Sequence, residues 1–553
     1  MQQVSVFPRK HKTTWSMCRK MPRPSDLMVV ILCGICLITT YMSISSSALF
    51  DRRIKQFPIN QEVKWIEQIS SSSSNHIKDF KSIAIHRCSD FEITTTKPVY
   101  IVGEEVKVHI VIRDSYNRRK SNGGDYVRLW IKDVTKGACA NGVITDNQNG
   151  TYTGIIKLPF EGNVKITVSL ATPKETLDAL YSNFNGKRIR EIIARFNKNG
   201  ISEDTICRPD EHIPGYAAVC NYTSGNYGFP WYCGRPSSSS ELSCSDWNVT
   251  STIMPELNYT DLYKKMFRNN RLHRQLKSKS SLYIIVSEDS TATREDNLTP
   301  CHDLPPRLSW PSSHPSGYLQ NWTWHVTHCR STFHDTPQRW NECLKSRTLW
   351  MFGDSTTRQF LFYLMEYLNL QLVTEKWLKK SWHKPSLLQS PKHNYSIFWG
   401  PHCFPFHNGV AWENLGSLKA THAYIDEIPS RSRDIVVIHF YLHFMAYHPD
   451  LYRLHVRRTR QSVAELKIRS PDTLVFVKGS HAFRDHGAII GRTDDIWGGI
   501  YDKIVEEEFT DLKDSVIFLN MWDMTVASEN KMQHPNRTII RAMVNYMMGF
   551  VKC

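Results

Sequence analysis

The stretch Leu349-Trp-Met-Phe-Gly-Asp-Ser-Thr-Thr-Arg-Gln-Phe-Leu-Phe-Tyr363 combines two patterns on either side of a corner. Residues 349–352 are short and continuously apolar, as in a buried strand of a parallel sheet. From Thr357 onward, apolar residues recur at spacings of three and four, as in an amphipathic helix. Gly353 permits a sharp turn between them. The stretch therefore predicts a strand, a turn and a helix, with Ser355 at the turn.

The predicted position of Ser355 suits catalysis. Open α/β sheets bind ligands at the carboxyl ends of their strands, and a helix N-terminus offers backbone N–H groups to an oxyanion. A serine hydroxyl in that place can attack an ester carbonyl when a histidine removes its proton. The tripeptide Gly353-Asp-Ser355 alone is a weak signal, but the flanking strand and helix and the nearby Arg358 strengthen it.

The chain around this turn has the pattern of an α/β domain. A Pro-rich boundary at residues 300–315 introduces it, and three further apolar runs follow at 435–440, 473–477 and 516–519. A helical pattern over 495–509 separates the last two runs. Alternating strands and helices predict a parallel sheet covered on both faces, here over residues 300–553.

The last predicted strand supplies candidates for the other catalytic groups. It ends in Asn520-Met-Trp-Asp523, and His534 follows eleven residues later. A nucleophile early in the domain and an acid/base pair near its end is one order in which a Ser-His-Asp triad occurs. We therefore predict that Ser355 is the nucleophile, that His534 takes its proton, and that Asp523 orients His534.

Backbone N–H groups near Ser355, at Gly353 and with help from Arg358, are the predicted oxyanion donors. His481, which follows the third strand, is a second candidate for that role. His439 and His443 also end or follow a strand, and we expect them to be core or surface residues. The sequence predicts no metal site, because the spacing of 13, 13 and 11 residues between Cys207, Cys220, Cys233 and Cys244 is too open for a zinc knuckle.

The N-terminal half has the two-residue period of β structure. Residues 106–112, 127–131 and 164–170 alternate as half-buried strands do, and an Asn149-Gly hairpin signal precedes a strand to residue 156. Short strands with turn signals predict a β-sandwich over about residues 91–172. The Cys-rich segment 207–244 is turn-rich, and we expect disulfides within it.

The N-terminus predicts entry into the secretory pathway. Residues 1–26 are basic and residues 27–44 form an apolar run without charge, which predicts a cytosolic tail and a transmembrane signal anchor. A cleaved signal peptide is the alternative, because small residues at 45–48 offer a cleavage site. Residues 45–85 have the composition of a stem with a flexible Ser-rich spacer.

Two further features predict the same compartment. Of 14 cysteines, 11 follow the apolar run, which predicts disulfides with one cysteine left over. The eight N-x-Ser/Thr sequons also follow it, at Asn149, Asn221, Asn248, Asn258, Asn297, Asn321, Asn394 and Asn536. The net charge of +16 includes no long basic block. A solvated surface accounts for it, and nucleic acid is not expected as a partner.

The phrase Gly353-Asp-Ser-Thr-Thr-Arg-Gln359 resembles the Gly-Asp-Ser-x-x-Arg-(Asn/Gln) signature of the PC-esterase branch of Gly-Asp-Ser-type esterases. The Asn149-Gly-Thr-Tyr152 phrase, with Pro159 and Gly162, resembles immunoglobulin-like domains of the filamin type. The whole chain resembles the neurexophilin and PC-esterase domain (NXPE) family. Residues 86–290 correspond to a neurexophilin-like domain and residues 300–553 to a PC-esterase-like domain.

The resemblance implies a three-layer α/β fold of the SGNH/GDS type in the second domain. It also implies a relation to luminal glycan O-acetyltransferases, some of which act on sialic acid, and a neurexin-like cell-surface protein as a partner. One position departs from the pattern. The superfamily places its acid three residues before the histidine, where this chain has Lys531. Asp523 would then substitute for that acid, a weaker group would orient His534, or the domain would be inactive.

The resulting hypothesis is a Golgi membrane glycoprotein that transfers an acyl group, most simply acetyl, to a hydroxyl of a glycan or glycoprotein through an acyl-serine intermediate. No bound cofactor is expected, and a donor such as acetyl-CoA would supply the acyl group. A carbohydrate O-acetylesterase would use the same residues with water as the acceptor. The third alternative is a secreted, catalytically inactive binding glycoprotein.

Overall fold

The computed structural model describes residues 79–184, 191–253, 265–266, 273–288, 298–310, 315–373, 385–402, 413–414, 419–445, 449–484 and 495–553. The predicted tail, anchor and most of the stem lie outside these residues. Among the described residues, no helix is both long and apolar enough to cross a membrane.

The C-terminal half is built on a mixed sheet in the order β20-β21-β22-β19-β24-β25-β26. The five strands from β22 to β26 in this order run parallel, and β20 and β21 are antiparallel. The strands are β19 (Thr348–Gly353), β20 (Gln371–Leu372), β21 (Ser386–Ser390), β22 (Tyr395–Pro401), β24 (Ile435–Ile438), β25 (Leu474–Lys478) and β26 (Val516–Leu519).

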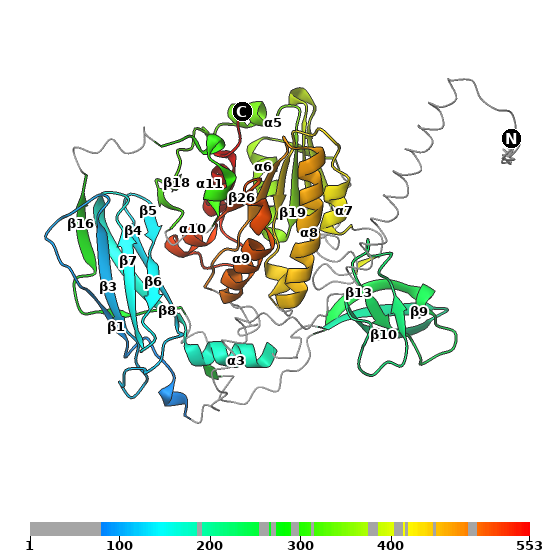
Figure 1. Ribbon diagram of the computed structural model, residues 1–553, viewed down its shortest axis with the longest axis horizontal. Helices are drawn as coiled ribbons and strands as arrows, with labels where there is room; N and C mark the ends of the chain where they lie inside the picture. Colours follow the sequence, from blue (N-terminus) through cyan, green and yellow to red (C-terminus); the bar gives the residue numbers. More distant parts are fainter. Residues whose placement is uncertain are drawn as a thin grey trace, which may run out of the picture. The chain divides into compact units, whose positions relative to one another are not determined.

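Helices cover both faces of this sheet (Figure 1). One face packs against α6 and α11 in a core that includes Met351, Trp399 and Phe476. On the other face α7 stacks Tyr424 on Phe352, and α8 packs between α7 and α9. The helices are α5 (Pro337–Leu344), α6 (Ser355–Tyr367), α7 (Thr421–Asp426), α8 (Pro449–Arg469), α9 (Ile496–Glu508), α10 (Trp522–Ala527) and α11 (Arg537–Met548).

The prediction of a parallel sheet is confirmed for five strands and did not include the antiparallel β20 and β21; each of the four predicted strands is present within two residues of its expected bounds. The strand β22 was not predicted. Its alternating pattern, Tyr395-Ser-Ile-Phe-Trp-Gly-Pro401, could have revealed it. The predicted helix over 495–509 is α9.

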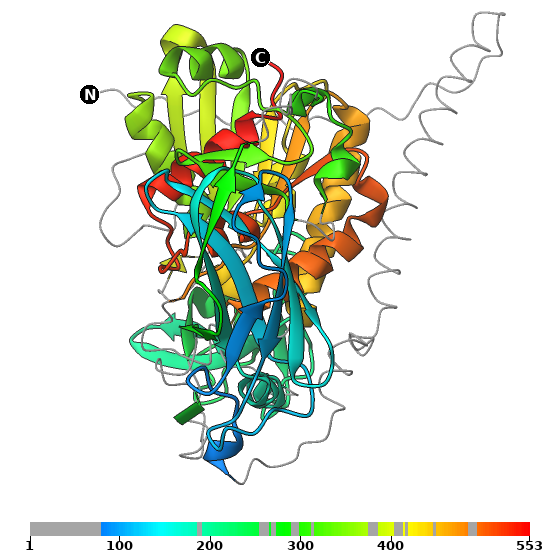
Figure 2. The same ribbon diagram turned by 90° about the vertical axis from the view of Figure 1, so that its left-hand side faces the viewer.

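The N-terminal half contains two sheets that share one core. A five-stranded sheet has the order β15-β1-β3-β7-β6, and a second sheet has the order β18-β17-β5-β4-β8-β16-β2, with β14 beside β8. Figure 2 looks onto the blue strands of the first sheet. Residues from both sheets, such as Val108 and Ile166, fill the core between them. The predicted strands correspond to β3, β4, β7 and β8.

The strands of these sheets are β1 (Asp90–Ile93), β2 (Tyr100–Ile101), β3 (Glu105–Val111), β4 (Tyr126–Asp133), β5 (Ala138–Asn141), β6 (Val143–Asp146), β7 (Thr151–Lys157), β8 (Gly162–Thr172), β14 (Arg274–Gln275), β15 (Lys277–Ser278), β16 (Tyr283–Ser287), β17 (Gly317–Gln320) and β18 (Thr323–Val326). The helix α3 (Lys174–Phe184) follows β8. The strands β17 and β18 follow the predicted boundary at residue 300, yet β17 pairs with β5 and extends the second sheet.

The Cys-rich segment contributes β11, β12 and the end of β10 to a third sheet in the order β11-β12-β10-β9-β13-β23. Disulfides Cys207–Cys233 and Cys220–Cys244 lie within it, as expected. The strands of this sheet are β9 (Glu191–Lys198), β10 (Ile201–Arg208), β11 (Val219–Asn221), β12 (Tyr232–Gly234), β13 (Trp247–Ile253) and β23 (Glu413–Asn414).

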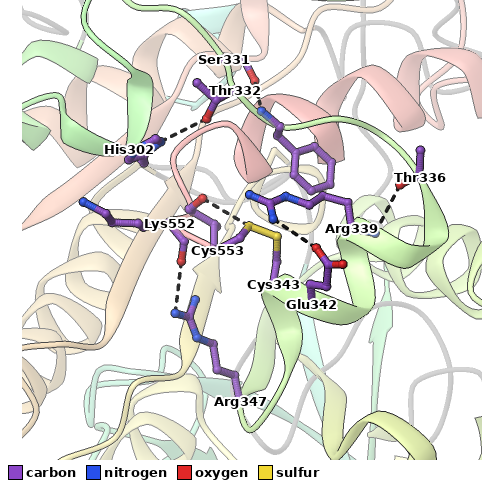
Figure 3. Close-up of a disulfide and its surroundings, with 12 residues drawn as sticks. His302, Ser331, Thr332, Thr336, Arg339, Glu342, Cys343, Arg347, Lys552 and Cys553 are labelled. Carbon is purple, nitrogen blue, oxygen red and sulfur yellow. Dashed lines mark hydrogen bonds and ion pairs between the residues drawn. A yellow bond between two sulfur atoms is a disulfide. The ribbon is translucent and has the colours of Figure 1, made fainter.

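Two more disulfides lie in the C-terminal half, Cys301–Cys329 and Cys343–Cys553. The second ties the last residue of the chain to α5, where Arg347 also donates to the carbonyl of Lys552 at 3.3 Å (Figure 3). Cys88 and Cys139 are both free. These two already exceed the predicted single unpaired cysteine, so that prediction is wrong; Cys139 is buried, and Cys403 lies outside the described residues.

Candidate active site

Ser355 is the first residue of α6 and follows the carboxyl end of β19. Asp354 caps the helix, since its carboxylate accepts a hydrogen bond from the backbone N–H of Thr356 at 2.8 Å. Gly353 is required here because a Cβ atom would come within 2.8 Å of the carbonyl oxygen of His439, which follows the neighbouring strand β24. The predicted strand-turn-helix geometry is present, and it presents the Ser355 hydroxyl at the edge of the sheet.

The structure brings Ser355 and His534 together. Ser355 Oγ lies 2.6 Å from His534 Nε2, although 179 residues separate them in sequence. His534 is in the segment between α10 and α11. Two contacts hold that segment in place: Gln359 donates to the carbonyl of Pro535 at 2.8 Å, and His481 Nε2 donates to the carbonyl of Gln533 at 2.7 Å.

The environment of His534 favours its uncharged form. His534 is exposed as a whole residue, but partial desolvation of its ring lowers its pKa below the usual 6.5; the charge of Asp354 opposes that change, and the charge of Arg358 adds to it. A neutral imidazole has one free lone pair, and at Nε2 this lone pair can accept the Ser355 proton. The pair thus has the geometry and the charge state of a nucleophile and its general base.

Asp523 does not meet His534. One carboxylate oxygen accepts from Asn141 Nδ2 at 2.9 Å, and the other accepts from the backbone N–H and the hydroxyl of Ser316 and from Asn520 Nδ2. Within the described part of the chain, no carboxylate lies within hydrogen-bond or ion-pair distance of His534. The prediction that Asp523 orients His534 is therefore wrong in this structure. Position 531, where the acid of the family pattern would be, is an exposed lysine.

The predicted oxyanion residues differ in what they can donate. Arg358 is on the first turn of α6, and its guanidinium carbon is 5.5 Å from the ring centroid of Trp399. His481 is fully buried, and burial holds its pKa well below 6.5. Its single N–H is therefore used on Gln533, and Nδ1 can only accept. The geometry assigns His481 to holding the His534 segment instead of the expected oxyanion role.

A buried polar cluster lies beneath Ser355 and was not predicted. It joins Asp354, His439 and Lys478, which are each 2% exposed or less. His439 Nε2 is 3.4 Å from Asp354 Oδ2 and 3.1 Å from Lys478 Nζ. Each of the three residues ends or follows a parallel strand, and that shared placement is the signal that could have found them.

The sequons for which the structure describes side chains are exposed: Asn149, Asn221, Asn321, Asn394 and Asn536. Asn258 and Asn297 lie outside the described residues, as does the side chain of Asn248. The Asn536 side chain also caps α11 by accepting from the backbone N–H of Ile539. Among the described residues, no group of His, Cys, Asp or Glu side chains could hold a metal ion.

The fold and the site define an α/β domain with a Ser-His pair at the carboxyl edge of its sheet, joined to a β-rich N-terminal half. Residues 324–553 match the family model described as the NXPE family member 4-like C-terminal domain. Residues 84–261 match the neurexophilin model. The chain belongs to the NXPE family. The neurexophilin and NXPE families are families of secretory-pathway glycoproteins, and the four disulfides agree with an oxidising compartment.

Similarity to solved structures is weak. A family two carbohydrate esterase from Clostridium thermocellum, an active-site mutant, matches at 9% identity with a TM-score of 0.20, over 81% of this chain and 92% of the esterase. A second structure of a family two carbohydrate esterase from the same organism matches at 10% identity with a TM-score of 0.19, over 84% of this chain and 98% of the esterase. The Escherichia coli adhesin FdeC matches at 12% identity with a TM-score of 0.13, over 37% of this chain and 65% of the adhesin. These scores are too low to carry an argument.

Proposed function

We propose that the protein transfers an acyl group, most simply acetyl, to a glycan hydroxyl through an acyl-serine intermediate. The observation that carries this proposal is the 2.6 Å contact between Ser355 Oγ and His534 Nε2 at the N-terminus of α6. A nucleophile within hydrogen-bond reach of a neutral base is the arrangement that acyl transfer requires.

In the first step Ser355 Oγ attacks the carbonyl carbon of the acyl donor, and its proton passes to His534 Nε2. The tetrahedral intermediate collapses, and the leaving group departs with the proton from His534. The sugar hydroxyl then attacks the acyl-serine and gives its proton to His534. Collapse releases the acylated sugar, and Ser355 recovers its proton from His534.

The imidazolium formed in each step needs a negative charge nearby. In a Ser-His-Asp triad a hydrogen-bonded carboxylate supplies it. Here Asp354, next to the nucleophile, is the carboxylate whose charge raises the pKa of His534. We assign to Asp354 a stabilising role through space, so that Ser355 and His534 act as a pair. Backbone N–H groups in the first turn of α6 and the Arg358 guanidinium are the proposed oxyanion donors.

The substrate and fold assignments rest on the resemblance to the PC-esterase branch and on membership of the NXPE family. The C-terminal domain is proposed to be of the SGNH/GDS three-layer type and the two N-terminal sheets to be an immunoglobulin/filamin-like sandwich. A donor such as acetyl-CoA, a Golgi location through an anchor at residues 27–44, and a neurexin-like partner belong to the same proposal. A carbohydrate O-acetylesterase would differ only in admitting water as acceptor.

The test is a Ser355→Ala variant of the full chain, expressed in cells that lack the protein. A fluorophosphonate probe reacts with an activated serine, forming an Oγ–P bond and releasing fluoride, and it needs no known substrate. Wild type should be labelled and should restore O-acetyl groups on cell-surface glycans, whereas Ser355→Ala should do neither. Ser346→Ala, at the opposite edge of the sheet, is the matched control and should behave as wild type.

The structural cost of Ser355→Ala should be within about 1 kcal/mol, since only a hydroxyl at a turn is lost. Normal secretory transit and sequon use by the variant would show that folding survived. Equal labelling and equal acetylation by wild type and Ser355→Ala would contradict the proposal and favour the binding glycoprotein. Labelling without any change in glycan acetylation, but with release of acetate from acetylated glycans, would identify the esterase.

A further inference from the structure

The cluster beneath Ser355 contains a buried negative charge. Burial raises the pKa of Asp354, but His439 and Lys478 outweigh burial, and the carboxylate pKa lies well below its usual 3.8. The carboxylate is therefore ionised, and both of its oxygens accept hydrogen bonds from neighbouring residues. One accepts from the N–H and the hydroxyl of Thr356, and the other from the backbone N–H of Leu442 at 3.1 Å.

The hydrogen bonds identify the residue that carries the balancing charge. His439 Nδ1 lies 2.8 Å from the carbonyl oxygen of Lys478, which can only accept, so Nδ1 carries a proton. Burial and the charge of Lys478 lower the pKa of His439, which leaves Nε2 unprotonated. Nε2 then accepts from Lys478 Nζ at 3.1 Å. The cation of the cluster is therefore the Lys478 ammonium.

The ammonium also contacts the turn directly. Lys478 Nζ donates to Thr356 Oγ1 at 3.2 Å, and that hydroxyl donates to Asp354 Oδ1 at 2.7 Å. On its remaining side the ammonium lies over the ring of Phe360, 5.9 Å from the centroid. Thr356 adjoins Ser355 in α6. Lys478 thus reaches the nucleophile through one side chain and one peptide unit.

We propose that Lys478 is a positioning residue for Ser355, and that its positive charge offsets Asp354 so that the adjacent serine can form an oxyanion. This inference rests on the acyl-transfer function proposed above. Without the ammonium, a buried carboxylate would stand one residue from the developing negative charge and would oppose it. Loss of the charge would also weaken the contacts that fix the turn at Thr356 and Leu442.

The ammonium of Lys478 can lose its proton within the pH range in which the protein can be assayed. Burial lowers the pKa of Lys478 to about 8, against the opposing charges of Asp354 and Asp502. Asp502, from α9, has a pKa raised to about 6 and is ionised at that pH. His439 and His481 face the cluster from the ends of β24 and β25, and His443 acts on Asp354 from the segment after β24. The pKa values of His439 and His481 are lowered, so neither changes charge near pH 8.

The experiment measures the rate of fluorophosphonate labelling of the purified full chain between pH 5 and 9.5. In wild type the rate should rise as His534 loses its proton and fall above about pH 8 as Lys478 loses its proton. Lys478→Met should label at least tenfold more slowly at pH 7 and lack the fall near pH 8. Lys478→Arg keeps the charge, so it should retain most of the rate and also lack that fall.

Lys467→Met is the matched control. This partly buried lysine of α8 donates to the carbonyls of Pro471 and Thr473 at the other end of β25, so its removal should leave the profile unchanged. If the labelling rate of Lys478→Met and Lys478→Arg still falls near pH 8, the assignment is overturned. A labelling rate of Lys478→Met equal to that of wild type at pH 7 would also overturn it. Absence of labelling in wild type would contradict the acyl-transfer function itself.

Discussion

At the scale of single residues, the function of a carboxylate depends on what its oxygens accept. Asp523 and Asp354 are both buried and both lie at the carboxyl edge of the sheet. Asp523 holds Asn141, Ser316 and Asn520 and has no contact with His534. Asp354 caps α6, and through space its charge opposes the desolvation that lowers the pKa of His534. Of these two carboxylates, the one in the Gly-Asp-Ser turn is therefore the one that acts on His534.

The change Asp523→Asn tests this difference. An asparagine side chain has one acceptor oxygen, so it cannot replace both carboxylate oxygens of Asp523 as hydrogen-bond acceptors. The variant should therefore lose about 1–3 kcal/mol of unfolding free energy, as expected for hydrogen bonds to a charged group. Its fluorophosphonate labelling rate should stay within threefold of wild type. Lys531→Ala, at an exposed position, should alter neither quantity. A hundredfold loss of labelling in Asp523→Asn with unchanged stability would restore Asp523 to a catalytic role.

At the scale of elements, the β19–α6 turn works because two strands approach closely. Gly353 pairs with Pro401 of β22, and its missing side chain leaves room for the carbonyl of His439, which follows β24, and for the side chain of Thr357. A larger residue would push β19 away from its neighbour and displace Ser355 from His534. The close approach, together with the Asp354 cap, is what holds Ser355 beside His534.

Gly353→Ala should therefore cost on the order of 2 kcal/mol of stability, as overpacking does, and should reduce labelling of Ser355 more than tenfold. Gly499→Ala in α9 is the matched control, because a Cβ there meets no atom within 4 Å. It should raise stability by about 0.5–1 kcal/mol through helix propensity and leave labelling unchanged. Thermal unfolding and probe kinetics measure both effects, and equal behaviour of the two variants would contradict the close-approach argument.

At the scale of the whole molecule, charged side chains join the β-rich half to the α/β half. Arg128 of β4 donates from one guanidinium nitrogen to both oxygens of Asp495, at 2.7 and 2.6 Å, and these residues are 6% and 0% exposed. Trp130 and Lys132, on the same strand, donate to Glu529 in the segment that carries His534. The β-rich half thus supports the histidine segment of the proposed active site.

Arg128→Met should destabilise the protein by about 3–5 kcal/mol, because it leaves Asp495 buried without its partner. Adding Asp495→Leu should recover part of that loss. Lys132→Met removes a more exposed ion pair and should cost within about 1 kcal/mol. Thermal unfolding of the secreted protein and its yield measure the three effects. A loss in Arg128→Met no larger than that in Lys132→Met would contradict the assignment of a buried, structural ion pair.

Several features could be predicted from sequence because they depend on local patterns. The strand-turn-helix at Ser355, the parallel strands after it and the disulfides of residues 207–244 follow from hydrophobic period, turn residues and cysteine spacing. His534 could be paired with Ser355 because the ends of parallel strands meet at one edge. The domain boundary was harder to predict, because β17 pairs with β5, which lies almost 180 residues earlier in the sequence.

The sequence by itself thus indicated a secretory-pathway chain, the α/β pattern, and Ser355 and His534 as the two residues that the structure brings together. The tertiary structure decided which carboxylates serve which role. Asp523 is followed by His534 in sequence, but its oxygens are satisfied by residues of distant segments. Lys478 and His439 join Asp354 because neighbouring strands bring them within hydrogen-bond distance. The charges of Asp354 and Lys478 then favour each other against the effect of burial, and both burial and contact are properties of the packed molecule that local sequence does not contain.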